Sequence, residues 1–367
     1  MICIIIILTL LRQYRIDPMS ELKKVLIVTY YWPPAGGPAI QRTLKFVKYM
    51  RFFGWEPVIL TVENGEYPAI DPSLIQEIPD NIQVYKTKAF QPFQLYRMLT
   101  GKKGNTHNNA NVFGQKDTTF VERLAKWIRL NLFIPDARIG WDAYAVKAAK
   151  KIIEQEHIDL IYSSSPPHSL QLIAQKIAKQ NKIKWVADFR DPWSELVHYQ
   201  SYKRTWLTRK IDSHFEKSVF RSADRLVAAA NDYATCIKTH VDRKIEVIYN
   251  GYDPSDFPKP KSRNTEDFLI TYTGELSEDR IPHALLRALS RLEHSNIKLQ
   301  FIGNTCPELK QEIQRLNLGN KVMLKPYMPH IASIAELQQS DLLLLVINQV
   351  ANGKGIVPGK IFEYLGT

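Results

Sequence analysis

Residues 24–50 read KVLIVTYYWPPAGGPAIQRTLKFVKYM, and this stretch decides the fold of the chain. Lys24–Thr29 is a short apolar run rich in β-branched residues, which predicts a buried strand. Prolines and the pair Gly36-Gly37 end it, and a helical pattern follows. The apolar face of that helix is predicted to contain Ile40, Leu44, Val47 and Met50. This order of elements is typical of the phosphate-binding end of a doubly wound α/β domain.

The two glycines are candidate ligand contacts. Because Gly36 and Gly37 lack Cβ atoms, a ligand can approach the backbone closely there. The start of the helix offers N–H groups and a positive dipole end to an anion. The pair also fits a tight strand-to-helix turn without a ligand, since it is a weaker signal than a full G-x-G-x-x-G motif.

Length and charge constrain the class of protein. A chain of 367 residues is expected to form about two domains. Residues 1–262 contain 38 Lys and Arg against 26 Asp and Glu, whereas residues 263–367 contain 11 of each, so the whole excess of +12 lies in the first part. Nucleic acid, an anionic membrane surface or an acidic substrate would explain this excess, and so would a solvated basic surface.

The first residues differ from the rest of the chain. MICIIIILTLL is too short to span a bilayer and lacks the flanks of a signal peptide. We interpret residues 1–22 as an extension outside the fold, with Met19 as a natural start; a short membrane-dipping anchor is the alternative. Cys3, Cys236 and Cys306 have no metal or disulfide spacing, which favours reduced thiols in the cytosol.

Strand and helix patterns alternate from here on, which predicts parallel strands joined by helical crossovers. The first domain is expected to cover residues 23–256. Its further strands are expected at Pro57–Val62, Ile82–Lys86, Ile158–Ser163, Lys184–Ala187, Arg225–Ala229 and Lys244–Tyr249. Its further helices are expected near Thr119–Leu132, Trp141–Glu156, Ser169–Lys179 and Thr205–Arg221, the last with an apolar stripe of Ile211, Phe215, Val219 and Phe220. Residues 101–117 are predicted to form a long surface loop.

A second domain of the same kind follows a polar linker at residues 257–267. It is expected to cover residues 268–367, with strands at Phe268–Thr273, Ile297–Gly303, Val322–Lys325 and Asp341–Ile347. We expect the two domains to face each other across a cleft. The chain ends within or just after the first turns of a helix, so we expect the second domain to be incomplete, truncated at its C-terminus.

Polar side chains follow two strands of the first domain. The candidate catalytic residues are Asp188, Arg190 and Asp191, in DFRDPW at one strand end, where two carboxylates and a guanidinium can orient a hydroxyl and hold an anion. A structural Asp–Arg pair would explain the same residues. His168 follows SSSPP at a neighbouring strand end, where it fits contact with a ligand or a helix-capping or packing role.

The second domain contains candidate groups for a phosphorylated ligand. Gly274 ends its first strand, and Arg280 follows the turn, where it could meet a phosphate or simply be solvated. In GKGIVPGKIFEY, Lys360 and Glu363 lie on one helix face near its N-terminus. The lysine can neutralise a diphosphate and the carboxylate can accept from ribose hydroxyls; an ordinary i, i+3 salt bridge is the alternative.

Taken together, these motifs resemble those of the family-4 glycosyltransferases of the GT-B fold, over about residues 23–367. The resemblance is carried by YYWPPAGGPAIQR, SSSPPHS, ADFRDPW, VIYNGYD, YTGEL and GIVPGKIFEYLG. It implies an α/β, GT-B-like architecture of two Rossmann-type domains. It also implies retaining transfer of a sugar from a nucleotide donor, with Gly36, Gly37, Gly274, Arg280, Lys360 and Glu363 on the donor.

Two positions depart from the family pattern. In the family's Glu-x7-Glu motif the second glutamate, the ribose ligand, corresponds to Glu363, but the first falls on Gly355. The family's His-Asp pair is replaced by Arg190-Asp191. The resemblance implies front-face attack in which donor phosphate accepts the proton, so no protein nucleophile is assigned. No metal motif with the right context is present, and we expect no obligatory metal or other cofactor.

The resulting hypothesis is a sugar transferase in cell-surface polysaccharide or lipopolysaccharide biosynthesis. It would use a nucleotide-sugar donor and a lipid-linked or polysaccharide acceptor, without nucleic acid, and would attach peripherally to the anionic inner face of the cell membrane. The basic residues expected to attach it are Lys203, Arg204, Arg209, Lys210 and Lys217, with Lys45, Lys48 and Arg51. A nucleotide-sugar epimerase of the same architecture and a non-enzymatic basic binding protein are the alternatives.

Overall fold

The computed structural model describes residues 22–36, 38–67, 69–91, 120–193, 204–259, 263, 265–292, 296–347 and 358–367. The chain divides into two compact units, one ending at Tyr249 and the other beginning at Asn250. Each contains its own parallel sheet with its own hydrophobic core. The prediction of two doubly wound α/β domains is confirmed.

The N-terminal unit is built on a seven-stranded parallel sheet in the order β5-β3-β1-β6-β7-β8-β9. The interior strand β1 pairs with β3 on one side, Leu26 opposite Val58, and with β6 on the other, Leu26 opposite Ile161. The strands are β1 Lys23–Val28, β3 Trp55–Val62, β5 Gln83–Thr87, β6 Leu160–Ser165, β7 Lys184–Phe189, β8 Arg225–Ala228 and β9 Ile245–Val247.

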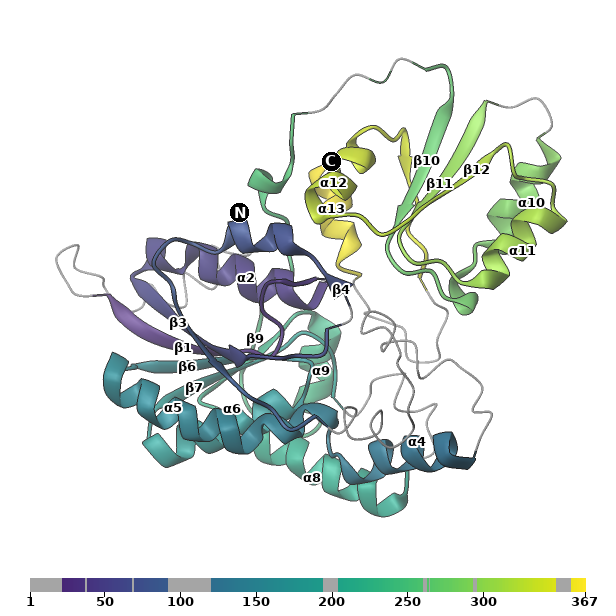
Figure 1. Ribbon diagram of the computed structural model, residues 1–367. Helices are drawn as coiled ribbons and strands as arrows, with labels where there is room; N and C mark the ends of the chain where they lie inside the picture. The colour runs from purple at the N-terminus through teal and green to yellow at the C-terminus, as the bar shows by residue number, and fades with distance from the viewer. Residues whose placement is uncertain are drawn as a thin grey trace. The chain divides into compact units, whose positions relative to one another are not determined.

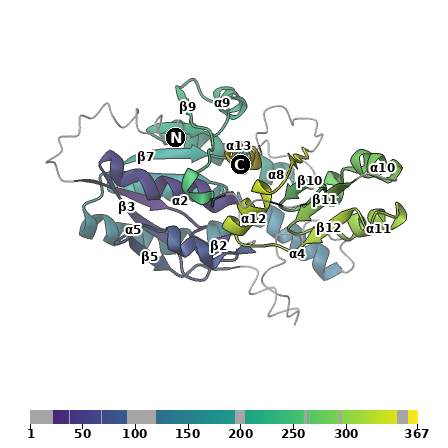
Figure 2. The ribbon, with the colours of Figure 1, turned by 90° about the horizontal axis from the view of Figure 1, so that it is seen from above.

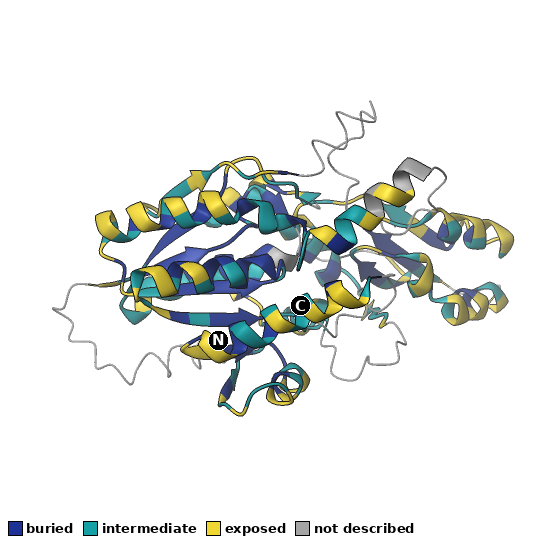
Figure 3. Ribbon diagram, turned by 90° about the horizontal axis from the view of Figure 1, so that it is seen from below, coloured by how far each residue is buried: buried dark blue, intermediate teal, exposed yellow. Residues whose placement is uncertain are grey.

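Helices cover both faces of this sheet (Figure 1). The α-helices are α2 Pro38–Met50, α4 Phe120–Leu132, α5 Asp142–Glu156, α6 Ser169–Asn181, α8 Trp206–Ser222 and α9 Asn231–Lys238. Short 3-10 turns lie at η1 Arg51–Phe53, η2 Pro72–Glu77 and η4 Ala137–Trp141. In Figure 3 the helices have buried faces toward the sheet and exposed faces outward, as amphipathic helices must.

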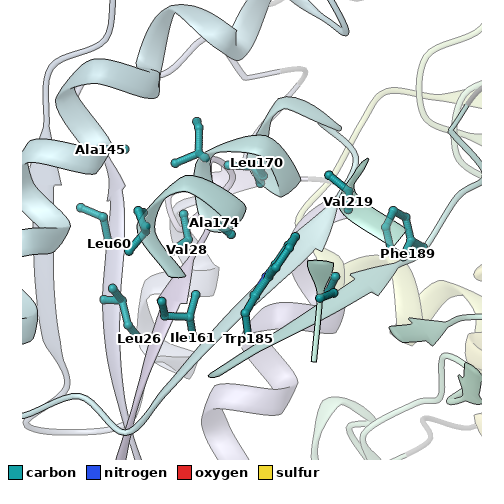
Figure 4. Close-up of a cluster of buried hydrophobic side chains, with 14 of the residues drawn as sticks. Leu26, Val28, Leu60, Ala145, Ile161, Leu170, Ala174, Trp185, Phe189 and Val219 are labelled. Atoms are coloured by element: carbon teal, nitrogen blue, oxygen red, sulfur yellow. The ribbon is translucent and has the colours of Figure 1, made fainter. Parts of the chain in front are cut away.

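The alternation of side chains along β1 explains the two layers. Val25 and Ile27 pack with Ile40 and Leu44 of α2, whereas Leu26 belongs to the cluster under α5, α6 and α8 shown in Figure 4. Successive side chains of a strand point to opposite faces, so an unbroken apolar run is needed when both faces are covered. Each fully buried aliphatic side chain contributes roughly 1.5–3 kcal/mol. The predicted face of α2 is confirmed, because Ile40, Leu44 and Val47 are buried in the cluster with Val25, and Met50 packs against that cluster, partly buried.

The C-terminal unit contains a four-stranded parallel sheet in the order β12-β11-β10-β13. Its strands are β10 Phe268–Thr273, β11 Ile297–Ile302, β12 Val322–Lys325 and β13 Leu342–Leu343. Its helices are α10 His283–Arg291, α11 Pro307–Arg315, α12 His330–Gln338 and α13 Lys360–Gly366, with 3-10 turns at η5 Pro254–Asp256 and η6 Glu278–Arg280. Figures 1 and 2 place α10 and α11 on one face of this sheet and α12 and α13 on the other.

Three local features differ in part from the predictions. The strand expected at Asp341–Ile347 is reduced to the two residues of β13. The glycine turn is not a simple connection, because β2 (Ala35–Gly36) pairs in antiparallel fashion with β4 (Ala69–Ile70). Of the stripe expected on α8, Val219 and Phe220 are buried and Ile211 and Phe215 are half-buried. The polar residues Asp212 and Glu216 share the buried face. Residues 1–21, Gly37, residues 101–117 and Lys203 lie outside the described residues.

Candidate functional site

The carboxyl end of β10 brings together residues that are distant in the sequence. Gly274 follows β10 with a φ of +112°, and a Cβ there would lie 2.7 Å from the Cε and Nζ atoms of Lys360. Gly303, at the end of β11, has a φ of +126°, and a Cβ on it would lie 2.5 Å from the Gly274 carbonyl oxygen. Both backbone angles favour glycine. A side chain at Gly274 would displace Lys360, and a side chain at Gly303 would push the two strand ends apart.

Lys360 is the first residue of α13 and is held against Tyr272. Its Nζ donates to Tyr272 Oη at 2.7 Å and lies 4.0 Å from the centre of the ring, and Tyr272 in turn donates to the Glu275 carbonyl at 2.9 Å. Burial first and then the charge of Arg280 lower the pKa of Lys360 to about 8, against the opposing effect of Glu363 and Glu275. Burial likewise raises the pKa of Tyr272 to about 12.

Arg280, in η6, completes this group, which we call the cation cluster: Tyr272, Gly274, Arg280 and Lys360. Arg280 lies close enough to lower the pKa of both Lys360 and Tyr272. Two cations whose charges repel each other at the carboxyl end of a parallel sheet form a site that an anion would stabilise. Three of the predicted donor-binding residues therefore lie together in the C-terminal unit.

Glu363 lies one turn further along α13 and contacts His330 at the start of α12. His330 Nε2 is 3.0 Å from Glu363 Oε1, and its Nδ1 is 4.0 Å from Asp256 Oδ2 in η5. Because a carboxylate only accepts hydrogen bonds, the first contact favours the tautomer with its hydrogen on Nε2. A carboxylate has two oxygens, so one can accept from His330 while the other accepts from a ligand hydroxyl.

In the N-terminal unit, Asp188 is occupied by other protein groups. Its side chain is fully buried (0% exposed), and Arg42 of α2 donates to both carboxylate oxygens, from Nε at 2.8 Å and Nη2 at 2.7 Å. Tyr162 Oη at 2.9 Å and Ser164 Oγ at 2.6 Å donate to Oδ2 as well. Burial alone would lower the pKa of Arg42, but the Asp188 carboxylate raises it above its usual range. The geometry supports an organising role for Asp188 and argues against the predicted catalytic one.

His168 is also buried rather than aimed at a ligand. Its ring stacks on that of Trp193, with centroids 4.9 Å apart and an interplanar angle of 16°. Neither ring nitrogen makes a hydrogen bond of good geometry, although the Pro192 carbonyl lies close enough to raise the pKa slightly. Burial and then the charge of Arg190 lower the pKa to about 3, so the ring is neutral. Of the two roles left open for His168, packing is the one that the structure supports.

Arg190 and Asp191 remain as the accessible part of DFRDPW. Arg190 Nη2 lies 3.6 Å from Asp191 Oδ2, and the Asp191 side chain is more exposed than that of Arg190. The Arg190 N–H donates to the Ser165 carbonyl at 3.0 Å, which attaches this loop to the end of β6. Gly36 belongs to β2, which pairs with β4, and Gly37 lies outside the described residues.

Several residues that shape these sites were not singled out from the sequence. They are Arg42, Tyr272, His330 and Trp193. Arg42 and Trp193 lie inside the quoted motifs, and Tyr272 comes two residues before Gly274. Their closeness to these motifs could therefore have identified them as candidate site residues. His330 had none, because its partner is 33 residues away on another helix.

Two family models match the sequence. The one described as Glycosyltransferase Family 4 matches residues 111–256, and the one described as Glycosyl transferases group 1 matches residues 254–358. Each therefore covers one of the two units in part. A comparison with curated proteins gave no match.

Solved structures with this architecture include three with TM-scores above 0.5. The Anabaena protein Alr3699/HepE, in complex with UDP and glucose, is 17% identical, with a TM-score of 0.53 over 88% of this chain and 73% of that one. Sucrose-phosphate synthase from Thermosynechococcus elongatus is 12% identical, with a TM-score of 0.56 over 88% of this chain and 74% of that one. A glycosyltransferase from Rickettsia africae ESF-5 is 16% identical, with a TM-score of 0.54 over 88% of this chain and 73% of that one. At these identities the likeness establishes the fold.

Proposed function

We propose that this chain, a glycosyltransferase of the GT-B fold, transfers a sugar from a nucleoside-diphosphate donor to a glycan or lipid-linked acceptor with retention of configuration. The observation that carries the proposal is the cation cluster: Lys360, Arg280 and Gly274 converge at the carboxyl end of β10. The leaving diphosphate gains negative charge as the glycosidic bond breaks. Cations already in place there stabilise that charge without reorganisation.

Each residue then has a distinct role in donor binding. Lys360 has a pKa lowered to about 8, chiefly by burial, and an adjacent diphosphate would stabilise its protonated form. Glu363 would accept from the ribose hydroxyls while His330 holds its other oxygen. Gly274 lets the diphosphate approach the backbone and leaves space for the lysine. The attacking hydroxyl would pass its proton to donor phosphate, and no protein nucleophile or obligatory metal is part of the proposal.

The choice of nucleotide and the location of the acceptor are also proposals. The Anabaena structure contains UDP and glucose, which makes UDP-sugars the first donors to test. A lipid-linked acceptor would place the protein at a membrane surface. Within the described residues, no helix combines the length and the apolar content needed to cross a bilayer. The attachment that we propose is peripheral, through surface side chains.

Lys360→Met tests the assignment of the diphosphate site. Losing one charged hydrogen bond costs roughly 1.5–3 kcal/mol, or about 10- to 100-fold in affinity. We expect that loss for a nucleoside diphosphate and a much smaller one for the matching nucleoside monophosphate, measured by titration calorimetry on the full chain. Lys310→Met, an exposed lysine on α11, is the matched control and should bind both as the unmodified protein does. Equal losses for the two nucleotides would contradict a diphosphate contact.

The transferase reaction itself is tested with a donor panel. The full chain is incubated with UDP-, GDP- and other nucleotide sugars, with and without candidate acceptors, and release of nucleoside diphosphate is followed. We expect one donor to be consumed faster when a suitable acceptor is added. Isomerisation of a donor without acceptor would instead identify an epimerase.

A further inference from the structure

Both exposed tryptophans of the described residues lie on neighbouring helices. Trp127 on α4 is 47% exposed and Trp206 at the start of α8 is 67% exposed, whereas the other described tryptophans are buried or half-buried. Asn131 joins the two helices, because its Oδ1 accepts from the Thr205 N–H at 2.8 Å and from Thr208 Oγ at 2.9 Å. Asn131 also donates to the Trp127 carbonyl at 3.0 Å, so the contact lies within one turn of both indoles.

The same two helices carry further exposed large apolar side chains. We call the group the apolar corner: Leu124, Trp127 and Leu132 on α4, and Trp206 and Leu207 on α8, all of them exposed. Single exposed apolar residues are ordinary, but several on adjoining helix ends form a patch that marks an interaction surface. Figure 1 shows α4 and α8 next to each other in the N-terminal unit.

The charges around the apolar corner are positive. Arg123, Arg209 and Lys210 are exposed, and Lys210 Nζ lies 4.9 Å from the centre of the Trp206 ring. Among the described side chains of α4 and of the first two turns of α8, the only carboxylate is that of Asp212. It is buried, and it accepts from Arg204 Nη1 at 2.6 Å and Trp193 Nε1 at 2.8 Å. The surface therefore presents indole rings within a basic rim.

The basic patch expected from the sequence is much reduced by internal ion pairs. Arg204 pairs with Asp212, Lys45 with Glu77 and Arg51 with Glu56. Of that predicted set, Arg209 and Lys210 are the described members that are exposed, and they lie beside Trp206. The charge available for a surface contact thus coincides with the apolar corner.

We propose that the apolar corner inserts into the headgroup region of an anionic lipid bilayer. Tryptophan is enriched where apolar and aqueous phases meet, since one edge of the ring is polar and its body is apolar. Basic residues beside it gain from anionic lipids, which completes the pattern of an interfacial anchor. The inference rests on the proposed function in one respect, that a lipid-linked acceptor gives the enzyme a reason to dock.

The test compares two serine variants of the full chain by co-sedimentation with vesicles of phosphatidylcholine, with and without phosphatidylglycerol. Trp127→Ser/Trp206→Ser should weaken partitioning to the anionic vesicles by about tenfold or more. Phe52→Ser, at a 78% exposed aromatic position away from the corner, should bind as the unmodified protein does. Brominated lipids should quench tryptophan fluorescence in the unmodified protein and much less in the double variant.

Three results would overturn the proposal: equal vesicle binding by the double variant and the unmodified protein, equal binding to neutral and anionic vesicles, or a lipid-free dimer that the double variant dissociates. The last would make a second copy of the chain the occupant. Nucleoside-diphosphate binding, measured on the same samples, separates this inference from the proposed function. The double variant should retain it, because the cation cluster lies in the other unit.

Discussion

At the scale of single residues, burial decides which polar groups can take part in chemistry. Asp188 lies near the carboxyl end of β7 and His168 follows β6, at the sheet edge where ligand-binding residues of open α/β sheets are usually found. Yet Asp188 is saturated by Arg42, Tyr162 and Ser164, and His168 is stacked on Trp193. Their neighbours Arg190 and Asp191 remain partly accessible. In this loop the accessible functional groups are therefore one arginine and one carboxylate.

Asp188→Ala should destabilise the N-terminal unit rather than act on catalysis alone. Removing one partner of a buried ion pair leaves the other charge uncompensated, at a cost of about 3–5 kcal/mol. The change is measured as the free energy of unfolding in denaturant. Arg42→Met/Asp188→Ala should recover part of the loss, because no buried charge is then left alone. A single variant that unfolds normally but transfers no sugar would restore the catalytic assignment.

His168 should make the protein less stable in acid. Its pKa is lowered to about 3 in the folded protein from an ordinary value near 6.5. The unfolded chain therefore binds a proton that the folded chain does not, and stability falls as the pH drops from 6.5 toward 3. Between pH 7 and pH 5 this group alone should cost about 2 kcal/mol.

His168→Phe keeps a flat ring against Trp193 and removes the titration. The free energy of unfolding of this variant should fall less between pH 7 and pH 5 than that of the unmodified protein, whatever its value at pH 7. His214→Gln, at an exposed position on α8, should leave the slope unchanged. Parallel pH profiles for His168→Phe and the unmodified protein would show that His168 is not the cause.

At the scale of elements, the functional side chains of α13 are held in position by residues of other elements. Its two charged side chains point to different partners, Lys360 to Tyr272 on β10 and Glu363 to His330 on α12. The predicted i, i+3 arrangement is present, but each charge has a partner from another part of the unit. The sheet and α12 thus set the positions of both groups before any ligand arrives, which reduces the cost of ordering them on binding.

Glu363→Ala should weaken donor binding by about 10- to 100-fold, because the ribose loses a charged hydrogen-bond acceptor. His330→Ala should cause a smaller loss, and His330→Gln, which keeps a donor, should recover part of it. Because both act on the ribose, they should weaken a nucleoside and its diphosphate to the same extent, unlike Lys360→Met. Glu308→Ala, in the first turn of α11, is the control. Unchanged donor affinity in calorimetry would remove Glu363 from the site.

The helix α8 shows why a stripe of apolar residues predicts a buried face only in part. Asp212 lies on its buried side because Arg204 and Trp193 satisfy both carboxylate oxygens. Meanwhile Trp206 and Leu207 at its start are exposed although they are apolar. Hydrophobic periodicity assumes that polar groups face water, which a buried ion pair violates.

At the scale of the whole molecule, the two units differ in the size of their sheets and in how their charge is distributed. The N-terminal unit contains the larger sheet and the basic excess, and the C-terminal unit, which is neutral from residue 263 onward, contains the cation cluster. The cluster is therefore a local concentration of positive charge in a part of the chain with no net charge. The N-terminal excess, in contrast, is spread over surface residues, several of which have acidic partners.

The sequence by itself determined the two α/β units, most of their strands and helices, and three of the four members of the cation cluster, Tyr272 being the exception. These follow from local patterns: apolar runs for buried strands, periodic faces for helices, and glycines at strand ends. The tertiary structure alone decided which polar groups are already satisfied. Arg42 donates hydrogen bonds to Asp188, which is 146 positions away in the sequence, and Lys360 donates to Tyr272, which is 88 positions away. Such pairings depend on packing between elements far apart in the chain, and no pattern within one element specifies them.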